Sequence, residues 1–253
     1  LGVFGEFATE AGDEVVMKVG ISYVDVEGAK RNFAAEIADK SFDEVRAEAF
    51  DAWNDALGSI EIEGGSDTDK RIFYTSLYHT MIEPRIHTDV DGRYVGGDLQ
   101  VHQSKGDFVK RTVFSGWDVF RSQMPLQTII NPSMVNDVIC SLMEQARTSG
   151  REYFERWEIF NAYSGCMLGN PAVSVLADAY VKGIRNYDVE EALRYAVNSS
   201  AKFGNDEYGY SPTDLCISHT LEYAYFDWCV ARLAEELGKT DVAASFKQKS
   251  EAW

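Results

Sequence analysis

Hydrophobic and polar residues follow two different periods along this chain, an alternating one near its start and a helical one over most of the rest. Residues 14–26 alternate, and one face of that stretch carries Met17, Val19, Ile21 and Tyr23. This pattern predicts a β-strand. A lone strand needs neighbouring strands to pair with and to pack against. Few other segments suit that role, so we expect residues 1–27 to be the end of an N-terminal β domain whose body is absent.

Helical spacing of apolar residues predicts amphipathic helices at 42–60 and 67–84. Later in the chain, a capping residue is followed three times by proline, a pair that satisfies a free amide and presets φ at a helix start. The pairs are Asn131-Pro132, Asn170-Pro171 and Ser211-Pro212, and the helices they predict span about 132–148, 171–184 and 212–237, with another near 189–202. Short loops between such helices indicate an α/α layered or toroidal array.

The chain therefore divides into three predicted parts. Residues 1–27 end a β domain, residues 28–66 form a helical linker, and residues 67–253 begin a helical domain. Within the helical part, the segment 91–102 predicts short extended structure. The last segment, 241–253, reads as a helix without a Gly or Asn cap at its end, so we expect that helix to run to the last residue and the domain to continue beyond it.

Composition narrows the possible partners. The net charge of −17 argues against nucleic acid and against an anionic membrane surface, because both select basic patches. No apolar run approaches the length of a membrane span. The cysteines have no CxxC spacing, and a chain of 253 residues has no need of disulfide staples. We therefore expect buried thiols at Cys140, Cys166, Cys216 and Cys229 rather than a disulfide framework or a structural zinc site.

The stretch FSGWDVFRSQMPL places Trp117, Asp118 and Arg121 in the first turn of a predicted helix. An indole face beside a carboxylate suits a sugar, because the ring stacks on C–H groups and the carboxylate accepts hydroxyl hydrogens. Ser115 and Asp118 also fit a capping box, in which Asp118 only closes the helix end. Local sequence leaves both interpretations open and favours the capping box.

Two further polar groups invite a metal interpretation. The turn HTDVDGRY gathers Asp89, Asp91 and Arg93 around a glycine, but it lacks the later ligands of a calcium loop, so a tight polar turn is favoured. His219 and Glu222 share one face of an apolar helix, a spacing that metal ligands sometimes use. A buried Glu must be paired or coordinated. Pairing, with His219 itself as a candidate partner, is favoured over a metal.

Taken together, these segments resemble glycoside hydrolase family 92. The stretches that carry the resemblance are FYTSLYHT…TDVDGRY, FSGWDVFRSQMPL, GCMLGNPAVSVLADAYVKGI and TLEYAYFDWCVARLAEELGK, which stand in the family's order and span most of the chain. The resemblance implies a calcium-dependent exo-α-mannosidase, usually bacterial, in which a β-sandwich precedes an (α/α)6 toroid. It also implies a mannose-containing glycan as the partner and a periplasmic, cell-surface or secreted location.

The resemblance assigns roles to particular residues. The family's W-D-x-F-R motif matches Trp117, Asp118 and Arg121, and its aspartate is expected to bind the terminal mannose. This expectation reverses the local preference for the capping box. The family's D-V-D-G-R-Y stretch matches the residues Asp89, Asp91 and Arg93, which are expected to line the same cavity.

The loop before G-C-M departs from the family pattern. Many members have an acid there, whereas this chain has Tyr163. Glu158, which lies earlier in the loop, matches no family motif. We therefore expect this loop to shape a subsite and Glu158 to take no part in catalysis.

The motifs that carry the family's catalytic acid and base, E-G-N-A-W-x-Y and G-D/N-E-D-x-G-Q-M, are absent from the chain, as is the G-N-E-P stretch of the calcium site. The resemblance thus implies a fragment that binds substrate, with the reacting pair and the calcium ligands on the remainder of its own polypeptide. We expect the complete protein to hydrolyse terminal α-1,2- or α-1,3-mannosides and the fragment alone to be inactive. The alternative is a non-catalytic helical array that binds glycans or a protein partner.

Overall fold

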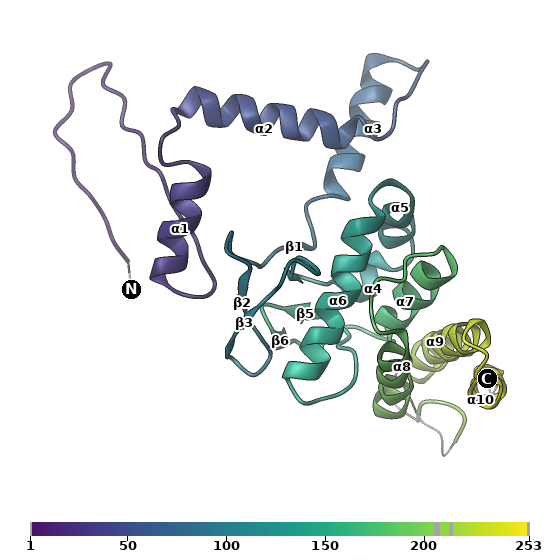
Figure 1. Cartoon of the computed structure of the whole chain (residues 1–253). Helices are drawn as coiled ribbons and strands as arrows, with labels where there is room; N and C mark the ends of the chain where they lie inside the picture. Colours follow the sequence, from purple (N-terminus) through teal and green to yellow (C-terminus); the bar gives the residue numbers. More distant parts are fainter. Residues whose placement is uncertain (1, 205–207, 213–214, 252–253) are drawn as a thin grey trace.

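The computed structural model describes residues 2–204, 208–212 and 215–251. Figure 1 shows three regions in chain order: an extended N-terminal segment with its first helices, a middle region of short hairpins, and a compact group of helices. The first helices are α1 (Val26–Glu36), α2 (Phe42–Leu57) and α3 (Asp67–His79). The prediction of a mainly helical fold is confirmed.

The compact group follows the predicted helices closely. Its members are α4 (Gly116–Val119), α5 (Gln123–Ile130), α6 (Pro132–Thr148), α7 (Pro171–Val181), α8 (Val189–Phe203), α9 (Cys216–Glu236) and α10 (Thr240–Ser250). Asn131 caps α6 as predicted, because its side chain accepts the Met134 N–H at 3.3 Å. Asn170 precedes α7 but makes no capping hydrogen bond.

Several predicted helix boundaries are wrong. The helices expected over 42–60 and 67–84 end at Leu57 and His79. The helix expected from residue 212 begins at Cys216, and residues 213–214 lie outside the described part of the chain. The last helix, expected to run to residue 253, is described as far as Ser250, with Glu251 in a turn, and residues 252–253 lie outside the described part of the chain.

The strand predicted over 14–26 is also not formed. Residues 2–24 contain no helix or strand, and α1 begins at Val26, inside the predicted strand. Met17, Val19 and Ile21 keep more than half of their surface exposed. A strand is stabilised by its neighbours, and no described segment pairs with this one. The assignment of residues 1–27 to a β domain, like the boundaries of the linker at 28–66, stays a prediction.

Three two-stranded antiparallel sheets lie between α3 and α7. The pairs are β1 (Arg85–Ile86) with β4 (Arg111–Thr112), β2 (Arg93–Val95) with β3 (Val101–Gln103), and β5 (Glu158–Ile159) with β6 (Ala162–Tyr163). The β2–β3 hairpin confirms the extended structure predicted at 91–102. A bridge between Phe114 and Glu158 ties the β5–β6 hairpin to the segment that leads into α4.

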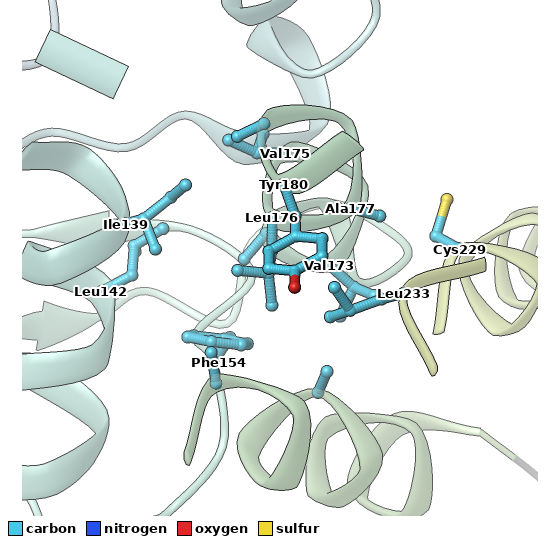
Figure 2. Close-up of a cluster of buried hydrophobic side chains, with 14 of the residues drawn as sticks. Ile139, Leu142, Phe154, Val173, Val175, Leu176, Ala177, Tyr180, Cys229 and Leu233 are labelled. Carbon is cyan, nitrogen blue, oxygen red and sulfur yellow. The ribbon is translucent and has the colours of Figure 1, made fainter. Parts of the chain in front are cut away.

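The hydrophobic core lies among α6, α7, α8 and α9. Helix α7 is its centre, because every residue from Pro171 to Tyr180 except Asp178 is buried. Figure 2 shows Val173 and Leu176 of α7 between Leu142 of α6 and Leu233 of α9. Each fully buried Val or Leu contributes about 1.5–3 kcal/mol, so these helices form a firm base for the loops before α4 and α7.

Three of the cysteines are free thiols, although not all are buried, and the side chain of Cys216 lies outside what the structure describes. Cys229 is buried in the core, Cys140 is half-buried and Cys166 is exposed. The prediction of buried thiols is therefore right for Cys229 and wrong for Cys166, which lies in a loop that no helix covers. Among the described residues, the structure holds no helix whose length and apolar character would let it cross a membrane.

Candidate functional site

The residues predicted to bind substrate fall into two groups. The first group, here called the turn cluster, consists of Asp89, Asp91 and Arg93 in the turn that enters β2. The second, here called the tryptophan site, consists of Trp117, Asp118 and Arg121 at α4 and just after it. Among the described residues, no hydrogen bond or ion pair joins one group to the other.

Asp89 of the turn cluster is buried, with 5% of its surface exposed. Its carboxylate accepts hydrogen bonds from the Ser22 hydroxyl at 2.7 Å and from the Asn32 amide at 2.9 Å. The Arg93 guanidinium lies 3.8 Å from it. Gly28 of α1 packs against this carboxylate, because a Cβ at that position would lie 2.2 Å from Asp89 Oδ2. Asp89 therefore fastens the N-terminal segment and α1 to the turn.

Asp91 and Arg93 extend the same junction with charge pairs. The Arg93 guanidinium lies 2.9 Å from the Asp25 carboxylate and 2.9 Å from that of Asp91. Arg31 of α1 also reaches Asp91 at 2.9 Å. The hydrogen bond from Arg93 is the main reason why the pKa of Asp25 lies below its ordinary value. All three charged side chains of the turn cluster are thus paired within the chain.

At the tryptophan site, Ser115 stands at the N-cap position of α4. Its side chain accepts no backbone N–H, so the predicted capping box is not formed in its usual sense. The Ser115 hydroxyl instead donates to the Asp118 carboxylate. Asp118 is exposed, and its carboxylate therefore has acceptor positions open to solvent as well as a local partner.

Arg121 connects the tryptophan site to α9. Its guanidinium carbon lies 5.1 Å from the centre of the Trp117 ring and 4.5 Å from that of Phe120. The same guanidinium donates to the Glu222 carboxylate at 2.6 Å. The predicted pairing of Glu222 with His219 is therefore wrong in its partner, because an arginine from the turn between α4 and α5 reaches the carboxylate. His219 lies near the Tyr223 ring and 3.4 Å from the Ser211 hydroxyl.

Glu158 is bound by groups of the chain itself, and its expected absence from catalysis stays a prediction. It is 2% exposed, and its carboxylate accepts hydrogen bonds from the Thr112 hydroxyl and from the backbone amides of Val113 and Asn161. Burial lowers the pKa of the neighbouring Lys110 ammonium, an effect that the Glu158 charge opposes. Glu158 thus holds the β5–β6 hairpin against the strand before α4.

Tyr163, which stands where many relatives have an acid, offers no carboxylate. Its ring is half-buried beneath the Arg151 guanidinium, whose carbon lies 5.7 Å from the ring centre, and burial raises the pKa of its hydroxyl. A cavity of about 300 Å³ lies between α9 and α10 and is lined in part by Tyr223, Asp227 and Gln248. It contains none of the predicted site residues.

No group of three or more His, Cys, Asp or Glu side chains in the described part of the chain could hold a metal ion. A calcium ion needs about six to eight oxygen ligands. The carboxylates of the turn cluster are occupied by arginine, hydroxyl and amide donors. The described residues therefore do not fit a calcium site by themselves.

The exposed Asp118 follows Trp117 directly in the chain, and both side chains are of the kind that sugar-binding sites use. Comparison with protein families agrees, because residues 28–253 match the model of the glycosyl hydrolase family 92 catalytic domain. The chain belongs to this family of glycoside hydrolases. A curated relative from the fungus Arthroderma benhamiae, described as an uncharacterized secreted glycosidase, is 28% identical over 94% of this chain and 30% of its own length.

Solved structures from Bacteroides thetaiotaomicron share the fold. A family 92 α-mannosidase, also solved with mannoimidazole, is 32% identical with a TM-score of 0.85, over 92% of this chain and 32% of the other. A family 92 inverting mannosidase is 34% identical with a TM-score of 0.83, over 91% of this chain and 33% of the other. The chain is thus mainly helical like these α/α toroid enzymes and spans about a third of the length of the relatives it matches.

Proposed function

We propose that the complete polypeptide that includes this chain is an exo-acting α-mannosidase, which hydrolyses terminal α-1,2- or α-1,3-mannosides with inversion. The observation that carries the proposal is the tryptophan site: Trp117 and the exposed Asp118 stand beside Arg121 in a chain of glycosyl hydrolase family 92. Two solved neighbours, a family 92 α-mannosidase and a family 92 inverting mannosidase, support the substrate class.

In this proposal the tryptophan site binds the terminal mannose. The Trp117 ring packs on the C–H face of the sugar, and the Asp118 carboxylate accepts hydrogens from its hydroxyls. Arg121 holds the indole in place and adds positive charge beside the carboxylate. The predicted place of Asp89, Asp91 and Arg93 in the same cavity stays a prediction; their contacts within the chain favour a role in orienting the N-terminal segment.

The reacting groups belong to the remainder of the polypeptide. Inversion requires an acid and a base on opposite sides of the scissile bond, about 6.5–9.5 Å apart. We assign both, together with the ligands of a calcium ion, to that remainder. The secreted relative supports an exported protein, which in a bacterium would be periplasmic, at the cell surface or secreted.

Incubation of the complete polypeptide with α-1,2- and α-1,3-mannobiose, with and without a calcium chelator, tests this proposal. We expect release of mannose that the chelator suppresses, with no release by residues 1–253 alone. Sugar binding without hydrolysis by the complete polypeptide would favour the non-catalytic glycan-binding alternative. Release by residues 1–253 alone would contradict the assignment of the acid and base to the remainder.

A further inference from the structure

Glu222 makes only half of the contacts that its carboxylate can make. One oxygen, Oε1, accepts from Arg121 at 2.6 Å. The other oxygen, Oε2, is buried and has no hydrogen-bond partner in the described residues. The side chain as a whole keeps 17% of its surface exposed, although Oε2 itself is covered. The Glu222 carboxylate is therefore held in place through Oε1, while Oε2 can still accept a hydrogen bond.

The loop before α7 closes around this oxygen. A Cβ at Gly169 would lie 3.2 Å from Glu222 Oε2 and 2.2 Å from a ring carbon of Phe226. Gly169 also has a φ of +74°, a backbone region that residues with a Cβ avoid. Glycine therefore allows the loop to come against the carboxylate at a distance that a larger residue would prevent.

Asn170, the next residue, adds a second unsatisfied group. It is 2% exposed, and neither the Nδ2 nor the Oδ1 atom of its side chain has a partner in the described residues. The sequence predicted a helix cap here, and the structure shows that the side chain makes no capping bond. An asparagine buried at a helix start without capping it is free to serve another contact.

The indole nitrogen of Trp117 is the third such group, again buried and without a partner in the described residues. It belongs to the same neighbourhood, because Arg121 stacks on Trp117 and pairs with Glu222. The first residues of α4 and α7 also pack together, since a Cβ at Gly116 would lie 2.5 Å from Pro171 Cγ. The three residues with unpaired polar atoms thus belong to elements that contact one another.

The chemistry of these atoms selects the ligand. More than about 90% of buried polar groups in proteins are hydrogen bonded, so the missing partners are supplied by water or by a ligand. A carboxylate oxygen only accepts, an indole nitrogen only donates, and an amide does both. A hydroxyl group can donate to the first and accept from the second, which makes a polyhydroxylated ring a better match than a purely anionic or cationic ligand.

We propose that Glu222 is a second substrate-binding carboxylate beside Asp118, with Oε2 accepting a sugar hydroxyl, and that Asn170 lines the same subsite. The ligand class, a terminal mannose, rests on the proposed function. In this arrangement Arg121 is the positioning residue, because it holds Oε1 and leaves Oε2 for the sugar. The competing explanation is that Glu222 serves only to anchor Arg121 over Trp117.

The decisive variant is Glu222→Gln in the complete polypeptide, because the amide oxygen can still accept from Arg121 while the amide nitrogen cannot accept from a hydroxyl. We expect the affinity for methyl α-mannopyranoside to fall by about tenfold or more, as for loss of a hydrogen bond to a charged group. The matched control is Glu236→Gln, which removes an exposed ion pair with Arg232 on the same helix at 3.3 Å. The affinity of Glu236→Gln for methyl α-mannopyranoside should stay within about twofold of that of the parent.

A set of monodeoxy methyl α-mannopyranosides separates direct contact from anchoring. If Oε2 accepts one hydroxyl, the parent loses affinity for the sugar that lacks that hydroxyl, and Glu222→Gln shows no further loss for it. The proposal would be overturned if Glu222→Gln lost further affinity for every monodeoxy sugar. It would also be overturned if Glu222→Gln bound methyl α-mannopyranoside as tightly as Glu236→Gln does. Circular dichroism and thermal unfolding of each variant identify any that fail to fold, and Asn170→Ala then provides the second test of the same coupling.

Binding is measured by saturation-transfer NMR, which needs no hydrolysis. A parent protein that binds methyl α-mannopyranoside but releases no mannose from mannobiose would contradict the proposed function while leaving the Glu222 contact testable. A parent protein that hydrolyses mannobiose, with Glu222→Gln unchanged in both affinity and deoxy-sugar profile, would overturn the Glu222 contact alone. A parent protein that binds no pyranoside would overturn both.

Discussion

The turn cluster and the tryptophan site both pair carboxylates with arginine, yet they differ in what remains unpaired. In the turn cluster, the buried Asp89 receives a hydroxyl and an amide hydrogen, and Arg93 joins two further carboxylates. At the tryptophan site, the indole nitrogen of Trp117 and one oxygen of the adjoining Glu222 are buried without a partner in the described residues.

This difference supports our proposal that the turn cluster holds the chain together and that the tryptophan site receives a ligand. A cluster whose hydrogen bonds are all satisfied within the chain gains nothing from a ligand and loses stability when it is broken. A cluster with unpaired buried atoms is stable only if water or a ligand completes it. Family motifs cover both clusters, so resemblance alone could not separate these roles.

The largest expected effect is on stability, through Asp89→Ala. Removal of this buried carboxylate leaves two donors and part of the Arg93 charge unpaired, and should lower the free energy of unfolding by about 3 kcal/mol. Thermal unfolding and limited proteolysis of the N-terminal segment measure it. Asp91→Ala, which removes a carboxylate with 30% exposure, is the control and should cost about 1 kcal/mol or less. Equal losses in the two variants would contradict the role of Asp89 as the buried fastener.

Substitutions at the tryptophan site should lower activity more than stability. In the complete polypeptide, Trp117→Ala or Asp118→Ala should reduce kcat/KM for mannosides by about 10- to 150-fold, corresponding to about 1.5–3 kcal/mol, because a contact with the sugar is lost. The unfolding temperature of Asp118→Ala should change little, since this residue is exposed. Near-parent kcat/KM in both variants, with unchanged circular dichroism, would return Asp118 to a purely local role beside Ser115.

Acidification should destabilise the contact between His87 and the N-terminal segment. His87 is 3% exposed and stacks on Tyr23 of the N-terminal segment at 4.6 Å, and burial lowers its pKa to about 4. Because the folded state resists protonation, the unfolded state binds the extra proton as pH falls from about 6.5 towards 4, so stability falls over that window. Between about pH 7.5 and pH 5 the loss should be about 2 kcal/mol.

Unfolding curves of the parent and of His87→Phe at several pH values measure this loss. The variant keeps an aromatic ring for Tyr23 to stack on but has no proton to gain, so its stability should depend less on pH over the same window. Identical pH profiles for the two proteins would show that another group causes the loss.

The smallest expected effect concerns the segment that leads to the tryptophan site. Val113 has a φ of +66°, which is strained for a β-branched residue, and Glu158 accepts its N–H at 3.1 Å. Val113→Gly should raise the free energy of unfolding by about 0.5–1 kcal/mol, since the relief of strain exceeds the entropy that glycine adds to the unfolded chain. Val113→Ala keeps a Cβ and is the control. A stability gain in alanine as large as that in glycine would contradict the strain.

Local sequence patterns predicted most of the helices and the β2–β3 hairpin, because apolar spacing and the residue that caps α6 act over a few positions. Longer motifs placed the chain in its family and pointed to Trp117, Asp118 and Arg121. The same local rules failed where the outcome depended on distant partners. The alternating stretch at 14–26 has the pattern of a strand, but no described segment pairs with it.

Only the tertiary structure decided the use of each charged residue. Glu222 pairs with Arg121 across 101 positions, whereas sequence spacing suggested His219. Asp89 pairs with Ser22 across 67 positions, a partner that neither the local pattern nor the family resemblance suggested. Asn170 has the sequence of a helix cap, yet makes no capping bond. Sequence fixes which atoms can donate or accept, but the chain must fold before those atoms meet. Which polar atoms find a partner, and which remain for a ligand, is therefore a property of the packed structure.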